Sequence, residues 1–336
     1  MTLKKIYITG IVSLFLFSCK NNKLDVDCSN VKISINYVNL DSLITKSDAK
    51  NLIKNHHRLQ KEMTEIYEYQ IGYCLGIGRV SDTAFVNSIQ QFKNDPFINR
   101  VENRIGEKFK NITLYKENIT QGFKNLKFHF PNGKTPTSIA FLNSLFRSNA
   151  WSTSKEIGIG IERYLGANTD VVKELPAESF FDWVKEGMNV DYLERDALCS
   201  WIMTHYVPEN ETNLAEGIIR WGKIIYLTEA ALPNVEKNII IRYTPEDYKW
   251  AEENEFAFWK YLVDEKLLFN NNERDKSNML NDGPFTIGLP EKGPDRLGQF
   301  LGWRMIKIYM EKNDISLQEL IKVPYNEILQ AYEIKE

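Results

Sequence analysis

Histidine is the side chain that most often binds a metal ion or moves a proton near neutral pH, and this chain has four of them. His56 and His57 are neighbours on a predicted helix, where adjacent side chains point to different faces and cannot chelate one ion together. His129 stands between two phenylalanines just before a proline, a setting typical of a structural residue. These three histidines therefore indicate no metal site.

His205 is the one histidine whose surroundings suggest chemistry. It follows a predicted helical stretch, 198–204, and two carboxylates, Glu209 and Glu216, come later in the chain. One histidine and two scattered carboxylates make a weak zinc site, and no HExxH motif is present. The chain also lacks a GxSxG elbow and a Walker loop. We therefore expect no catalytic residues, no bound metal and no cofactor.

Several charged residues stand at the ends of predicted elements, and such ends converge at clefts more often than their middles do. Glu162 and Arg163 close a strand, and Asp295 and Arg296 open a helix. Lys223 follows a glycine that lets a neighbouring element approach. We expect one polar cleft lined by Glu162, Arg163, His205, Lys223, Asp295, Arg296 and Trp303. The alternative is that these residues are solvated and far apart.

The N-terminus carries the pattern of an exported protein. Lys4 and Lys5 precede an apolar run of twelve residues, 6–17, which has the length of a signal-peptide core. Ser18-Cys19 then resembles a bacterial lipobox, in which the cysteine takes lipid and the leader is cut before it. We expect a signal peptide over 1–18, a lipid on Cys19 and a polar tether over 19–30. An ordinary secretory leader, cut elsewhere, is the alternative.

If Cys19 is lipidated, three cysteines remain, an odd number for an oxidising compartment. One disulfide could form among Cys28, Cys74 and Cys199, and the sequence leaves its partners open. No CxxC pair exists. We favour Cys74 and Cys199 as small buried hydrophobic residues.

Composition excludes several classes of protein. The 336 residues include 43% hydrophobic residues, enough for a large core, so neither disorder nor a fibrous repeat fits. A net charge of −3 argues against a nucleic-acid partner, which favours a basic excess. After the leader, no apolar run approaches the roughly 20 residues of a membrane span.

Apolar residues recur at helical spacing over 52–70, over 97–109 behind Asp95-Pro96, over 214–225 and over 297–308. Thr244-Pro245 is a helix start, with a capping threonine and proline at the first position. Ser316 opens a capping box for what we expect to be the last helix. Most of the chain is therefore predicted to be helical.

Two segments in the middle of the chain instead predict strands. Residues 137–142 form one, and 157–161 alternate isoleucine with glycine to form another. The glycine face would let a second backbone approach closely. We expect the two strands to pair, with 146–155 as the loop between them. The predicted fold is α+β, a helix-rich single domain over 31–336 with a small central β-sheet.

An ordered set of segments behind the lipobox resembles the gliding motility lipoprotein GldB family of the Bacteroidetes. The resemblance runs from the leader to about residue 320. It is carried by Phe128-His129-Phe130-Pro131, residues 160–166, residues 222–227 with Leu232-Pro233, Tyr243-Thr244, Asn254-Glu255, residues 294–298 and residues 302–306. Members of that family carry an acidic residue before the Gly-Lys pair, where this chain has Trp221.

The resemblance implies an envelope lipoprotein that faces the periplasm and is held to a membrane by its lipid. It implies a non-catalytic role in gliding, beside the motor and the associated secretion apparatus. The family also looks distantly like zinc proteases with an HExxH helix. His205 would then correspond to the second histidine of that motif. Trp201 and Ile202 would stand where the first histidine and the glutamate belong, which implies a degenerate zincin-like core.

Two other functions stay open at this point. One is an active metal-dependent hydrolase, which the missing ligands disfavour. The other is a periplasmic module that binds peptide or glycan, which the aromatic density of the second half allows. The membrane leaflet and the direct protein partner are not encoded in any recognisable motif.

Overall fold

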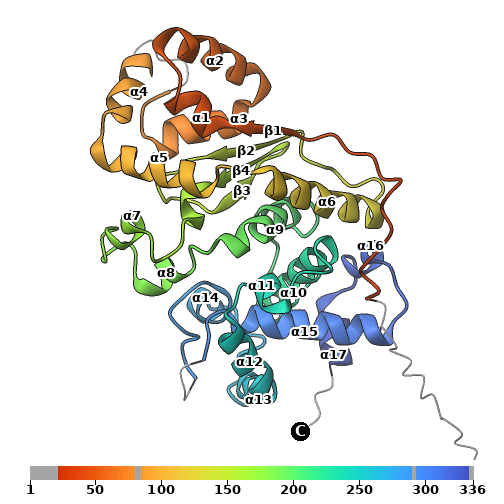
Figure 1. Cartoon of the computed structure of the whole chain (residues 1–336). Coiled ribbons are helices and arrows are strands. Elements are labelled where there is room, and N and C mark those ends of the chain that lie inside the picture. Colours follow the sequence, from red (N-terminus) through yellow and green to blue (C-terminus); the bar gives the residue numbers. More distant parts are fainter. Residues whose placement is uncertain (1–21, 80–84, 290–292, 333–336) are drawn as a thin grey trace, which may run out of the picture.

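The computed structural model describes residues 22–79, 85–289 and 293–332 (Figure 1). A four-stranded sheet has the order β1-β2-β4-β3. The strands β1 (Asn36–Asn39), β2 (Ser138–Leu142) and β4 (Glu156–Gly160) are parallel, and β3 (Ala150–Ser152) pairs antiparallel with β4. Strands β2 and β4 are buried along their whole length, as parallel strands with both faces covered usually are.

The sheet separates two hydrophobic cores. Ile139 and Phe141 of β2 face the larger core, and Ala140 and Leu142 face the smaller one, as the two-residue period of a strand requires. The smaller core is closed by four helices and a π-helical turn. These are α1 (Leu40–Thr45), α2 (Ala49–Glu62), α3 (Thr64–Tyr69), the π-helical turn Gln70–Cys74 and α4 (Phe85–Lys93).

The larger core holds the long helices. Below the sheet in Figure 1 lie α6 (Thr113–His129) and α9 (Leu193–His205), then α10 (Leu214–Ala231) and α15 (Leu297–Lys312). The remaining helices are α5 (Pro96–Lys108), α7 (Asp170–Lys173), α8 (Asp182–Glu186), α11 (Lys237–Ile241), α12 (Pro245–Glu253), α13 (Glu255–Asp264), α14 (Glu273–Leu280), α16 (Leu317–Leu320) and α17 (Tyr325–Ala331). Short 3₁₀ turns span Ile161–Tyr164 and Val190–Tyr192. The prediction of a helix-rich α+β fold is confirmed.

The helix starts predicted from capping signals are confirmed. Asp95 accepts hydrogen bonds from the first amides of α5, and Thr244 caps α12. Ser316 and Glu319 form the predicted capping box of α16. That helix is not the last one, since α17 follows it.

The single helix predicted over 52–70 is wrong. The backbone leaves the helical conformation at Met63 (φ −148°, ψ 68°), so α2 ends and α3 begins there. The break points the fully buried Met63 into the smaller core. It also frees the N–H of Ile66, which donates to the Glu156 carboxylate of β4 at 2.9 Å. A contact with the sheet, 90 residues away in sequence, therefore sets the helix boundary.

The two predicted strands pair, and in parallel. The loop between them contains β3, which the sequence did not predict. The glycine face of β4 is closely approached, since a Cβ on Gly160 would lie 2.2 Å from the carbonyl oxygen of Ser148. On Gly158 it would lie 2.5 Å from the Trp151 ring.

Helices α10 and α15 lie side by side (Figure 1) and touch through two glycines. A Cβ on Gly222 would come within 2.3 Å of the Gly302 backbone. A Cβ on Gly302 would come within 1.9 Å of the carbonyl oxygen of Ile218. The predicted close approach at Gly222 is thus confirmed.

The segment predicted as a tether lies against the domain from Asn22 onward. The Asn22 side chain donates to the Pro233 carbonyl oxygen at 2.9 Å, and Leu24 is buried. The Cys28 thiol is buried too and lies 3.1 Å from the Asn125 side-chain oxygen. Leu24 supplies the apolar contact that holds this segment down, so the polar character of its neighbours was misleading.

Cys28, Cys74 and Cys199 are all free and buried in the described part of the chain. The interpretation of Cys74 and Cys199 as buried hydrophobic residues is confirmed. The leader over 1–18 and the lipidation residue Cys19 lie outside the described residues. Within the ranges that are described, no helix combines the length and apolar character required to cross a bilayer.

Candidate functional site: an arginine-lined cavity

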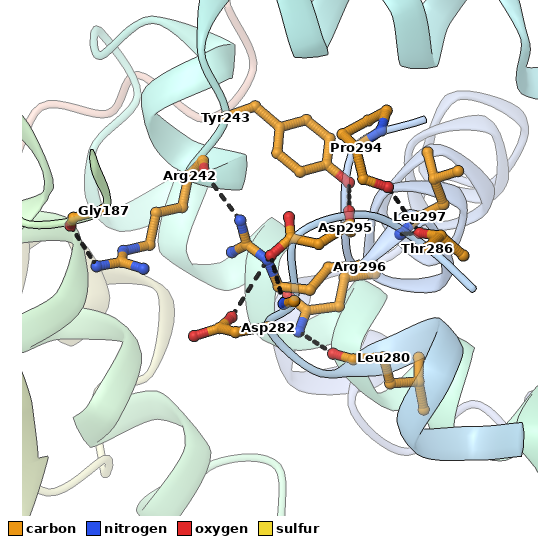
Figure 2. Close-up of polar contacts among 12 residues, drawn as sticks. Gly187, Arg242, Tyr243, Leu280, Asp282, Thr286, Pro294, Asp295, Arg296 and Leu297 are labelled. Atoms are coloured by element: carbon orange, nitrogen blue, oxygen red, sulfur yellow. Dashed lines mark hydrogen bonds and ion pairs between the residues drawn. The ribbon is translucent and has the colours of Figure 1, made fainter. Parts of the chain in front are cut away.

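A cavity of about 250 Å³ opens where the end of β4, α8, the start of α12 and the start of α15 meet. We call it the arginine cavity. Its wall includes Arg163, Arg242, Tyr243, Asp282, Asp295 and Arg296, most of them drawn in Figure 2. Trp183 and Tyr192 add aromatic surface to the same wall. Of the seven residues predicted for one cleft, the structure brings Arg163, Asp295 and Arg296 together here.

Arg296 holds the floor of the cavity together (Figure 2). Its Nε lies 3.0 Å from Asp295 and 3.2 Å from Asp282, and its Nη2 donates to the Arg242 carbonyl oxygen at 2.9 Å. Burial alone would lower the pKa of Arg296, but the two carboxylates raise it more, so the net shift is upward. The residue has a left-handed backbone (φ 53°) just before α15. Arg296 is therefore a buried structural residue that holds Asp282, Asp295 and the Arg242 backbone together.

Asp295 is engaged by the backbone as well as by Arg296. Its carboxylate accepts a hydrogen bond from the Gly283 N–H at 3.1 Å, and its carbonyl oxygen accepts one from the Tyr243 hydroxyl. An acidic residue just before a helix also complements the helix dipole. Through these hydrogen bonds Asp295 in addition ties the segment around residue 283 to the start of α15.

Arg242 also has a left-handed backbone (φ 66°), and its side chain is only 12% exposed. Its Nη2 donates to the Gly187 carbonyl oxygen at 2.9 Å, and its Nε lies 3.3 Å from Asp196. Asp196 is shared, because Arg195 lies 3.2 Å from its other oxygen. Burial raises the pKa of Asp196, but the arginines lower it more, so the carboxylate stays ionised.

Arg163 differs from the other two arginines of the wall. Its Nε donates to the Asn149 side-chain oxygen at 2.6 Å, and its Nη1 donates to the Phe146 carbonyl oxygen at 3.3 Å. Both acceptors are neutral, and among the described residues Arg163 belongs to no ion pair. Burial lowers the pKa of Arg163, the neighbouring Glu162 carboxylate opposes that shift, and Arg242 adds to it. Arg163 is therefore the arginine of the wall that has no ion-pair partner among the described residues.

Glu162 lies behind the cavity rather than in its wall. It is fully buried, and its Oε1 accepts hydrogen bonds from the N–H groups of Ser144 and Phe146, at 3.0 and 2.8 Å, and from the Ser144 hydroxyl. Its Oε2 has no hydrogen-bond partner among the described residues. Burial raises the pKa of Glu162 to about 7. This carboxyl group holds the loop after β2, where Leu145 and Phe146 have left-handed backbones.

Lys223 and Trp303 lie elsewhere. Lys223 lines a separate cavity of about 350 Å³, where its ammonium donates to the carbonyl oxygens of Val323 at 2.7 Å and Ile321 at 3.3 Å. The Trp303 indole is buried and donates to Glu229 at 2.6 Å. The predicted shared cleft is thus divided, because α10 turns Lys223 toward the C-terminal segment.

His205 lies at a third place, beside the edge strand β3. Its ring stacks on Trp201 with centroids 3.7 Å apart, and its Nε2 lies 2.9 Å from the Thr153 carbonyl oxygen. Burial lowers the pKa of His205. Across the described ranges, no three His, Cys, Asp or Glu side chains are grouped so that they could hold a metal ion.

Sequence reasoning missed Arg242, Asp282 and Trp183 as wall residues. Arg242 stands two residues before the capped start of α12, and Asp282 opens an Asp-Gly-Pro turn. Both positions belong to the class of element ends used above for Arg163 and Asp295. The same criterion, applied to turns as well as to strands and helices, would have found them.

Comparison with known proteins gives one match. The family model described as "Gliding motility protein GldB" matches residues 21–335, nearly the whole chain. No curated protein and no solved structure gives a significant match.

Proposed function

The chain belongs to the GldB family of gliding motility proteins, and from this membership we propose that it is a non-catalytic lipoprotein of the cell envelope that gliding requires. The observation that carries the proposal is the extent of the family match, which spans both cores and the arginine cavity. The proposed partners are other envelope components of the gliding and secretion machinery.

The proposed lipid would hold the domain close to a membrane. Cys19 precedes Asn22 by three residues, and Asn22 is hydrogen-bonded to Pro233. Three residues of extended chain span roughly 10 Å. More than one acyl chain on Cys19 would make this attachment stable. The surface near Asn22 and Pro233 would then face the bilayer.

The arginine cavity would remain accessible in that arrangement. In Figure 1 the segment from residue 22 to β1 lies on the right, near α6 and α16, whereas α8 and α14 lie on the left. Trp183 of α8 and Asp282, just after α14, belong to the cavity wall. The cavity is therefore well separated from the proposed anchor and would be open to a partner in the periplasm.

The surroundings of His205 support the non-catalytic part of the proposal. In an HExxH helix, the histidine four residues earlier shares the zinc ion with the second histidine. That position is Trp201 here, and its indole stacks on the His205 ring and offers no metal-binding atom. His205 therefore lacks the neighbouring ligand that a catalytic site of this type requires.

Fractionation and gliding assays in native cells test the proposal. Cells lacking the protein should not glide, and the wild-type gene should restore gliding. The Cys19→Ala variant should leave the membrane fraction or fail to mature, whereas Cys28→Ser, a change at the next cysteine, should keep the protein in the membrane. A Cys19→Ala protein that is processed normally and stays in the membrane contradicts the anchor. Deleted cells that glide normally contradict the role in gliding.

A further inference from the structure

We propose that the arginine cavity binds the free carboxylate of an organic ligand, such as the C-terminus of a peptide, with Arg163 as its principal contact. The inference deepens the proposed function, since it gives the chemistry by which this envelope protein would recognise a partner. It rests on the missing ion-pair partner of Arg163, on the contacts that hold its guanidinium, and on the rim of the cavity.

The first observation is that Arg163 has no ion-pair partner in the described part of the chain. Arg242 is paired with Asp196, and Arg296 with Asp282 and Asp295. Arg163 instead donates only to the neutral oxygens of Asn149 and Phe146. Glu162 attracts the Arg163 guanidinium from behind the cavity without forming an ion pair, and Arg242 repels it. An anion in the cavity would give Arg163 the ion pair that the other two arginines of the wall already have.

The second observation is that the donors of Arg163 are held in place. Asn149 and Phe146 fix its Nε and Nη1. The Phe146 backbone is in turn held by Glu162. The two bonds donated by Arg163 leave three of the five N–H donors of the guanidinium, on Nη1 and Nη2, for a planar carboxylate, which accepts two parallel hydrogen bonds. Little side-chain freedom would then be lost on binding.

The third observation concerns the rim, which limits the class of anion. Asp282 is a wall residue whose side chain is 58% exposed, and Glu186 and Asp247 belong to the same wall. A dianion such as phosphate would meet these carboxylates as it entered. A single carboxylate carries less charge to repel, and an organic group attached to it could pack on Trp183 and Tyr192. The cavity thus favours an organic monocarboxylate over a phosphate.

Calorimetric titration of the full-length lipoprotein in detergent tests this inference. The probes are trialanine, trialanine with a C-terminal amide, acetate and inorganic phosphate. Trialanine should bind and its amide should not. If acetate binds as tightly as trialanine, the result would support a carboxylate site and indicate that the ligand is a small organic acid. No carboxylate binding, equal binding of the amide, or tighter binding of phosphate would overturn the inference.

Variants link the binding to Arg163. Arg163→Gln should weaken trialanine binding by about tenfold or more, the usual effect of losing hydrogen bonds to a charged group. Arg163→Lys keeps the positive charge but loses the planar guanidinium, so its affinity for trialanine should lie between those of the wild type and Arg163→Gln. It replaces Arg163→Gln as the test if that variant does not fold. Arg220→Gln is the matched control, since Arg220 is buried beside the separate cavity of Lys223. Unchanged affinity in both Arg163 variants would overturn the inference. The titration is independent of gliding, so it can fail while the role in gliding stands.

Discussion

The arginine cavity and the crossing of α10 and α15 differ in whether the chain fills the space between its elements. At the crossing, Gly222 and Gly302 bring the two backbones into contact, and the Trp303 indole is buried and donates to Glu229. In the cavity, a space of about 250 Å³ is left open, and Arg163 in its wall has no ion-pair partner among the described residues. This difference is why we interpret the crossing as a packing contact and propose that the cavity recognises a ligand.

The largest expected effect tests the crossing as a packing device. We predict that Gly302→Val unfolds the protein or costs more than about 4 kcal/mol, because the new side chain would meet the carbonyl group of Ile218 in the neighbouring helix. Urea denaturation followed by circular dichroism measures the loss. The control is Gly106→Ala in α5, where a Cβ meets no atom within 4 Å. That change should stabilise the protein by about 0.5–1 kcal/mol. A Gly302→Val protein as stable as wild type would show that the helices do not pack as described.

The next effect distinguishes the structural residue Arg296 from the proposed ligand-binding residue Arg163 in the same wall. Arg296→Ala removes the partner of two carboxylates, one of them mostly buried, and should cost about 3–5 kcal/mol. Denaturation of the purified variant measures this cost. Arg163→Gln in the same wall breaks no ion pair and should cost less than about 1.5 kcal/mol. If the two variants were equally stable, Arg296 would not be structural.

A smaller effect concerns Glu162, which supports the cavity from behind. Its pKa is raised from 4.5 to about 7 in the folded protein, so folding takes up a proton between these two pH values. The stability of the wild type should therefore fall as pH rises from about 4.5 to 7, by up to about 3 kcal/mol from this group. Glu162→Gln should lack this component, whereas exposed Glu178→Gln should keep it. Parallel pH profiles for the wild type and Glu162→Gln would contradict this.

Local signals made part of the fold predictable. Asp95, Thr244 and Ser316 cap their helices through atoms within four residues, so the sequence alone locates those helix starts. Strand β1 was missed because it is four residues long and half polar, and its place is set by pairing with β2. The break at Met63 was missed because Glu156, on a distant strand, determines it.

The candidate site was predictable only in part, for the same reason. Arg163 and Arg296 were identified because each stands at an element end, and the two do share a wall. Lys223 was grouped with them because it follows Gly222, where a neighbouring element was expected to approach closely. The direction in which α10 turns that side chain depends on where the segment around residue 323 packs, and no local pattern encodes it.

We propose that ligand recognition by Arg163 in the arginine cavity is what this protein contributes to gliding. The most direct test measures gliding of native cells that express Arg163→Gln in place of the wild type, at equal abundance in the membrane fraction. These cells should lose gliding, while cells with Arg220→Gln, altered beside the other cavity, should still glide. Normal gliding by the Arg163→Gln cells would contradict it.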